Sequence, residues 1–257
     1  GSILGNLLLV MGFSILIGGL KNGQQKFDRS RVGLDATMTI LAVIVLSVPS
    51  VFSAAIEPDK TRVEELSLTT ALAIIVIYVL SIVYALRSHR GEEEVGPTVK
   101  PTHTGPQWNT RTALGILAAA TVGIALMSEF LVGAVEPVTQ ALGFSEFFVG
   151  IIFIPIIGNV AEHLVAVQVA IKNRMDLSLT IALGSSLQIA LFVTPALVFL
   201  SLLLGHPLAL EFNAFELIAL VAAAVIAAFV ALDGESNWLE GAMLLVVYVV
   251  LGLAFFF

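Results

Sequence analysis

Long apolar stretches recur along the chain and predict its fold class. Each is about 20 residues with few or no charges, enough for a helix to cross roughly 30 Å of hydrocarbon. They lack the alternation of apolar and polar residues that marks transmembrane strands, which are about half as long. We predict eight helical spans, at residues 1–20, 36–56, 66–86, 112–135, 147–171, 177–205, 212–232 and 238–257.

The composition strengthens this prediction. Hydrophobic residues make up 58% of the chain and charged residues only 12%, and the mean hydropathy is +1.01, outside the range of soluble globular domains. Cysteine is absent, which excludes disulfides, thiolate metal ligands and thiol catalysis. We therefore expect an all-α, polytopic membrane bundle that contacts the lipid bilayer and has no nucleic-acid partner. Homo-oligomer formation is left open.

The basic residues between the spans predict the orientation. If successive loops alternate sides, ten Lys and Arg residues lie on one side, and only Lys60 and Arg62 lie on the other. The positive-inside rule then places the loop 20–35, the turn 172–176 and the segment 87–111 in the cytoplasm, and both chain ends on the opposite side.

Residues 87–111 predict a linker between two halves. This segment, "RSHRGEEEVGPTVKPTHTGPQWNTR", combines Gly, Pro and Thr with an acidic run at Glu92, Glu93 and Glu94. It separates residues 1–86, with three spans, from residues 112–257, with five. A regulatory cation-binding role for the acidic run is the alternative to a plain solvated loop.

An internal repeat relates the two halves. "GSILGNLLLV" (1–10) aligns with "GSSLQIALFV" (184–193) with five identities in ten, and the loop charges give the two spans opposite directions. Inverted repeats of this kind are typical of secondary transporters, whose substrate sites lie at the repeat interface near the membrane midplane. At the same offset the counterpart of "GNVAEH" (158–163) would fall ahead of Gly1. We therefore expect two further N-terminal helices as partners of these spans.

Polar residues within one span predict a functional site. Ionisable groups at bilayer depth are costly and are functional by default. In "FIPIIGNVAEHLVAVQVA" (153–170), Pro155 and Gly158 predict a kinked or partly unwound helix. Asn159, Glu162 and His163 follow at i, i+3 and i+4, on one helical face that is expected to line a polar cavity. A Glu–His pair that only joins two helices is the structural alternative.

The next span supplies more oxygen atoms. Ser185 and Gln188 lie about a turn into this span, beside Gly184, where we expect a second helix break. With the carboxylate of Glu162 they form a set of hard ligands suited to calcium or sodium. Serines in such spans also serve helix packing. The short turn "KNRMD" before this span brings them near Glu162 and favours the cation site.

Two other polar residues keep two interpretations each. Asn6, in the repeat-related part of the first span, is either a cation ligand or an interhelical hydrogen-bonding residue. Glu129, about two turns inside its span, is either a gating or proton-access carboxylate or a structural one. The remaining carboxylates near span ends receive no functional role; these are Glu136, Glu211 and Glu240, while Glu216 stays unassigned.

Three segments together resemble the calcium/proton (cation/proton) exchanger family of the calcium/cation antiporter superfamily. "GNVAEHLVAVQVAIKNRMDLSLTIALGSSLQIALFV" (158–193) resembles its second α-repeat, "GSILGNLLLVMG" (1–12) the back half of its first, and "DGESNWLEG" (233–241) its C-terminal pattern. The resemblance implies a ten-helix inverted-repeat core, often with one additional N-terminal helix. It also implies a transporter, not an enzyme, that needs no cofactor and exchanges calcium for protons. Glu162 would be the shared calcium and proton site, and no residue here matches the family's other central glutamate.

The expected mechanism is alternating access with competition at a midplane carboxylate. A proton neutralises Glu162 in low-dielectric surroundings, and a divalent cation displaces that proton. His163 would fix the rotamer of Glu162 or tune its proton affinity. Alternatives are a sodium/calcium exchanger, an ion channel, and an intramembrane metal hydrolase, which lacks the three protein ligands of a catalytic zinc.

Overall fold

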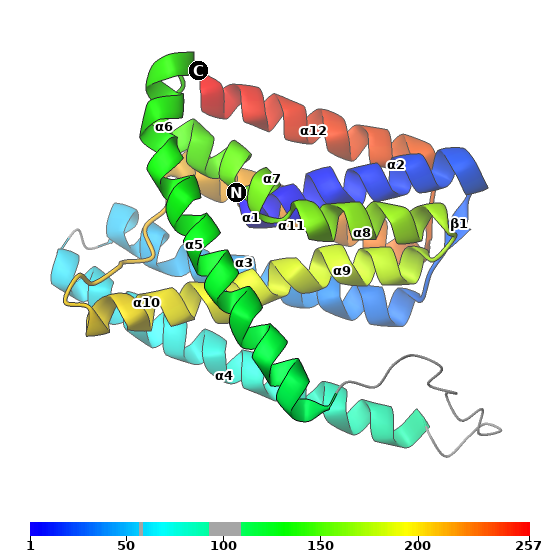
Figure 1. Ribbon diagram of the computed structural model, residues 1–257, viewed down its shortest axis with the longest axis horizontal. Coiled ribbons are helices and arrows are strands. Elements are labelled where there is room, and N and C mark those ends of the chain that lie inside the picture. Colours follow the sequence, from blue (N-terminus) through cyan, green and yellow to red (C-terminus); the bar gives the residue numbers. More distant parts are fainter. Residues whose placement is uncertain (57–58, 93–108) are drawn as a thin grey trace.

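The computed structural model describes residues 1–56, 59–92 and 109–257, and nearly all of them are helical (Figure 1). Within these ranges, seven helices are long and apolar enough to cross a bilayer. Two further segments, Glu146–Gly158 and Val160–Ile171, make an eighth span that is bent by 59°. The predicted all-α bundle of eight spans is therefore confirmed.

The first half contains three spans. The first is built from α1 (Ser2–Leu4), the π-helical η1 (Gly5–Val10) and α2 (Met11–Asn22), and it is followed by the short strand β1 (Gln25–Lys26). The other two are α3 (Arg29–Ala55) and α4 (Lys60–Glu92). Both begin several residues before the apolar runs because polar residues extend a helix beyond the hydrocarbon; Asp28 caps α3 by accepting the N–H of Ser30 at 2.8 Å.

The predicted linker is partly wrong. Its first residues, 87–92, continue α4, and its last two belong to α5. Helix propensity carries α4 past the apolar run, where no Gly or Pro precedes Gly91 to stop it. Residues 93–108, including Glu93 and Glu94 of the acidic run, lie outside the described residues.

The second half contains five spans. The first is α5 (Thr110–Leu142), and the bent span that follows consists of α6 (Glu146–Phe148), the π-helical η2 (Val149–Phe153), α7 (Ile154–Gly158) and α8 (Val160–Ile171). The next span consists of α9 (Met175–Gln188), the π-helical η3 (Ile189–Val193) and α10 (Thr194–Leu203). The last two spans are α11 (Ala214–Asp233) and, after strand β2 (Glu235–Ser236), α12 (Trp238–Phe256). Strands β1 and β2 pair antiparallel, with Gln25 opposite Ser236.

The inverted repeat is visible in the backbone. Figure 1 shows the span α1–η1–α2 running toward β1 and the span α9–η3–α10 running away from that end. The π-helical segments η1 and η3 end at Val10 and Val193, two residues that the sequence alignment of the repeats places together. Packing follows the same symmetry, because α2 packs on α12, α10 packs on α4, and α3 packs on α11.

Small residues allow these helices to approach closely. The buried face of α11 consists of alanines, namely Ala219, Ala223, Ala224, Ala227, Ala228 and Ala231. Where α12 crosses α2, a Cβ on Gly241 would collide with the backbone N of Leu16 and lie 2.6 Å from the carbonyl oxygen of Gly12. Lipid offers no hydrophobic driving force between helices, so close backbone packing of this kind holds the bundle together.

The segment "DGESNWLEG" connects α11 to α12. Helix α11 ends at Gly234, whose φ of +75° is a left-handed conformation that favours glycine. Strand β2 follows, and Asn237 then caps α12 in a capping box with Glu240. In the described chain this motif therefore terminates one helix, starts the next and places Gly241 against α2.

A connecting segment in each half is also hydrogen-bonded to residues of the other half. After α2, the buried side chain of Gln25 donates from Nε2 to the carbonyl of Ala170 at 3.0 Å and to Oδ1 of Asn173 at 2.9 Å. Asn22 donates to the carbonyls of Ala170 and Ile171, both at 3.2 Å. These side chains add hydrogen bonds at the C-terminal end of α8, where helical carbonyls run out of intrahelical partners; Ala170 also accepts the N–H of Asn173 at 3.0 Å.

The segment between α10 and α11 is held in the same manner by the first half. Ser50 Oγ of α3 donates to the carbonyl of Leu210 at 3.0 Å and accepts the N–H of Phe212 at 2.9 Å. Ser67 Oγ of α4 accepts the N–H of Leu210 at 3.0 Å. Backbone groups that no helix satisfies are thus paired with hydroxyls from the opposite half.

Candidate functional site

The break between α7 and α8 positions the candidate site. Asn159 leaves the helical conformation with φ −106° and ψ 11°, one residue after Gly158 and four after Pro155. The bend therefore falls where these two residues are expected to place it. It also starts a new helix inside the bundle, with Glu162 in the first turn of α8. The free N–H groups and the dipole at a helix N-terminus favour a negative charge there.

Glu162 is joined to the neighbouring span by a short hydrogen bond. Ser185 Oγ of α9 donates to Glu162 Oε2 at 2.7 Å. Deeper in the same interface, Ser178 Oγ donates to the carbonyl of Ala166 at 2.8 Å, which keeps α8 and α9 in register. The Glu162 side chain is exposed in the described chain, and one of its carboxylate oxygens is turned toward α9.

The other predicted ligands lie in three settings. Asn159 is half-buried at the break, and Gln188 is exposed at the end of α9. Asn6 is almost fully buried in η1, and its Nδ2 has no hydrogen-bond partner among the described residues. His163 is half-buried, and its Nε2 is likewise buried without a partner in that part of the chain. A buried polar atom without a partner is costly, so both atoms retain an unused hydrogen bond.

One expectation, the helix break at Gly184, is corrected, and one, the gating role of Glu129, stays a prediction. Gly184 is not at a helix break: it lies within α9, and the π-helical segment begins five residues later, at Ile189. The helix continues because an isolated glycine removes no backbone hydrogen bond. Glu129 is exposed on α5, and its carboxylate makes no hydrogen bond within the described ranges. Its gating role stays a prediction.

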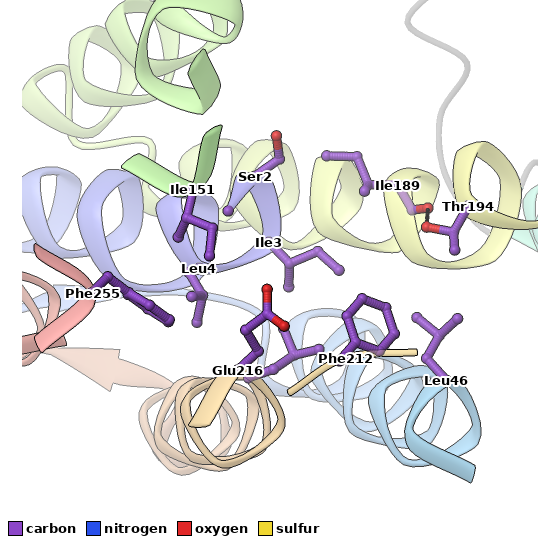
Figure 2. Close-up of a pocket in the computed structure, with 12 residues that line it drawn as sticks. Ser2, Ile3, Leu4, Leu46, Ile151, Ile189, Thr194, Phe212, Glu216 and Phe255 are labelled. Atoms are coloured by element: carbon purple, nitrogen blue, oxygen red, sulfur yellow. Dashed lines mark hydrogen bonds between the residues drawn. The ribbon is translucent and has the colours of Figure 1, made fainter. Parts of the chain in front are cut away.

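The sequence left one lining carboxylate unassigned. A cavity of about 190 Å³ lies where α1, α3, α11 and α12 meet, and Glu216 of α11 points into it (Figure 2). Ser2 and Thr194 are the other polar side chains of its lining. No sequence pattern predicts this cavity, because its walls come from segments spread between residues 1 and 255.

In the part of the chain that the structure describes, Glu162 has no second carboxylate grouped with it to complete a cluster of metal ligands. Among the described residues, no three His, Asp or Glu side chains are grouped as metal ligands. Calcium takes six to eight oxygens, so Glu162, Ser185 and their neighbours offer part of such a shell. One carboxylate with hydroxyl and amide neighbours can either bind a proton or supply part of a cation's ligand shell.

Comparison with known proteins identifies the family. The model of the family "Sodium/calcium exchanger protein" matches residues 1–87 and 112–257. A Ca(2+)/H(+) antiporter from Aphanothece halophytica is 41% identical over 274 residues, which cover 100% of this chain and 72% of that protein. The Ca(2+)/H(+) antiporter ChaA from Bacillus subtilis is 39% identical, with 100% and 73% covered.

A solved structure agrees with the sequence comparison. The structure of native YfkE superimposes with a TM-score of 0.82 at 36% sequence identity, covering 100% of this chain and 72% of that chain. The matched residues include both repeat spans, the break at Asn159 and the Ser185–Glu162 pair. The chain therefore belongs to the sodium/calcium exchanger protein family.

Proposed function

We propose that the protein exchanges calcium for protons across a membrane by alternating access, and that Glu162 binds both ions in turn. The observation that carries this proposal is the 2.7 Å hydrogen bond from Ser185 to Glu162 beside a helix break. The names of the relatives, which are Ca(2+)/H(+) antiporters, support the choice of ions.

Exchange follows from competition at the carboxylate. A proton on Glu162 neutralises it, whereas a divalent cation stabilises the charged form and expels the proton. Ser185 donates to the charged form and so favours the cation-loaded state. Binding of one ion lowers the affinity for the other. A loaded site that becomes accessible from the opposite side of the membrane therefore couples the two fluxes.

In this proposal, three further side chains and water supply the remaining ligands of calcium. Asn6 and Gln188 lie within the two repeat spans, and Asn159 lies at the break between α7 and α8. His163 orients Glu162 or tunes its proton affinity, and water completes the shell. Glu129 of α5 controls proton access.

Further helices are part of the proposal. The most apolar window of α5 contains no buried residue, and Glu162 is exposed. We expect N-terminal helices with a second "GNxxE" sequence to cover both. In a homo-oligomer a second copy would instead cover α5. A photoactivatable crosslinker attached to a cysteine introduced at the exposed Leu126 of α5, in native membranes, would separate a crosslink within the chain from one between copies.

The orientation follows the loop charges. The linker, β1 and the turn 172–174 face the cytoplasm in this proposal, and the segment 205–213 faces the opposite side. Labelling of single cysteines at Gln24 and His206 with an impermeant reagent in intact cells tests it. We expect only the cysteine at His206 to react.

Flux measurements separate calcium/proton exchange from sodium/calcium exchange. The protein is reconstituted into vesicles, and calcium uptake is driven either by a pH gradient or by a sodium gradient. We expect saturable uptake with the pH gradient alone. Uptake driven only by sodium would establish the alternative, and non-saturable flux would indicate a channel.

A further inference from the structure

A second carboxylate lies in an apolar cavity away from the Glu162 site. The cavity of about 190 Å³ is lined mainly by aliphatic and aromatic side chains, including Leu4, Leu46 and Phe255. Glu216 is the one acidic residue of this lining. Figure 2 shows its carboxylate directed from α11 toward Ile3 and Leu4 of α1. An ionisable group in a membrane span is functional by default.

One oxygen of Glu216 is fixed and the other is open. Oε2 accepts the backbone N–H of Asn213 at 2.8 Å, and the N–H of Glu216 donates to Asn213 Oδ1 at 2.8 Å, which completes a capping box. Oε1 accepts no hydrogen bond from the residues that the structure describes. The capping box therefore holds the carboxylate in place and leaves Oε1 to the cavity.

The surroundings suit a proton better than calcium. Calcium takes six to eight oxygens, and apart from Glu216 the side chains of the cavity offer only the hydroxyls of Ser2 and Thr194. Thr194 Oγ1 already donates to the carbonyl of Ile189 at 2.8 Å. A proton needs a single oxygen, and Oε1 of Glu216 is available for it.

The described side chains that face Glu216 carry no compensating charge. The other elements around the cavity contribute uncharged side chains: Leu46 from α3, Phe255 from α12, and Ile189 and Thr194 from the second repeat span. No described Lys or Arg lines the cavity.

We propose that Glu216 is a proton-binding residue of the exchange, located at the end of the bundle opposite β1 and β2. This inference rests on the proposed function. A proton from water binds Oε1 while Oε2 keeps its bond to Asn213, and the proton returns to water when calcium moves the other way. Glu162 then handles the cation and the proton at the centre, and Glu216 handles protons alone.

The test uses Glu216→Gln, because glutamine preserves the capping box and the side-chain volume but binds no proton. In vesicles we expect proton-driven calcium uptake to fall about a hundredfold, the lower end of what a positioned proton-transfer group contributes. Binding of radioactive calcium to the purified protein should stay unchanged. Glu216→Asp, which keeps an ionisable group, should recover part of the activity together with its pH dependence.

Glu211→Gln is the matched control. Glu211 lies on the segment just before α11, but its carboxylate accepts from Ser53 at 2.6 Å and does not line the cavity. This variant should exchange like the wild type. Wild-type rates and an unaltered pH profile in Glu216→Gln would overturn the inference, as would weakened calcium binding in that variant. Failure of the wild-type protein to exchange calcium for protons would instead refute the proposed function.

Discussion

Ser185 Oγ lies 2.7 Å from Glu162 Oε2 and joins α9 to the first turn of α8. Hydrogen bonds to a charged carboxylate are among the stronger ones in proteins. The bond therefore holds the side chain of Glu162 toward the second repeat span, which is where the proposed function requires it to bind a cation.

Replacing Glu162 with glutamine should abolish calcium/proton exchange. Gln keeps the shape and the bond from Ser185 but carries no charge and binds no proton, so it cannot exchange one ion for the other. Proton-driven calcium uptake in vesicles is the measurement. Glu136→Gln, a carboxylate near the end of α5 that accepts from Gln140, is the control and should transport normally. Full transport by Glu162→Gln would refute the assignment of the shared site.

Replacing Ser185 with alanine should shift calcium binding to higher pH. Loss of the donor disfavours the charged carboxylate, so the proton is held more tightly and calcium competes less well at a given pH. A hydrogen bond to a charged group contributes about 1.5–3 kcal/mol, which corresponds to about one to two pH units. Calcium titrations across a pH series measure the shift.

The neighbouring serine provides a matched control for that change. Ser186 Oγ donates to the carbonyl of Ala182 within its own helix and is fully buried. Ser186→Ala should leave the pH dependence of calcium binding in place. An equal shift in both variants would mean that the effect comes from packing of α9 and not from the bond to Glu162.

The site shows how far a sequence can be interpreted. The turn "KNRMD" placed Glu162 near Ser185 because the two spans it joins have to run side by side, and Pro155 with Gly158 located the bend. Gly184 was wrong as a break, since a glycine weakens a helix without removing a bond. Gln25 carried no signal, because its partners Ala170 and Asn173 lie more than 140 residues away.

Replacing Gln25 with alanine should destabilise the protein. The change removes one buried and one part-buried hydrogen bond and leaves the carbonyl of Ala170 with one partner fewer, at a cost of about 1–3 kcal/mol. Thermal unfolding in detergent is the measurement, and we expect a lower Tm. Gln24→Ala, an exposed neighbour, should unfold like the wild type. Equal Tm values for the three proteins would show that the Gln25 bonds contribute no net stability.

Replacing Gly241 with alanine should separate α2 from α12. The new Cβ would collide with the backbone of Leu16 and Gly12, and overpacking of this kind costs about 1–3 kcal/mol. Gly252→Ala on the same helix is the control, because its Cβ would lie 3.7 Å from Ile152, an ordinary contact. The two variants are compared by thermal unfolding. Similar stability of both would contradict a close crossing at Gly241.

The pairing of α2 with α12, α3 with α11 and α4 with α10 has a mechanical consequence. Each pair joins one sequence half to the other, so the paired helices form one interlocked frame. The two halves cannot move apart as separate bodies without breaking these contacts. Helix α5 stands outside that frame, with Thr139 as its buried residue in the described chain. Among the described residues, displacement of α5 therefore breaks fewer contacts between helices than separation of the paired helices.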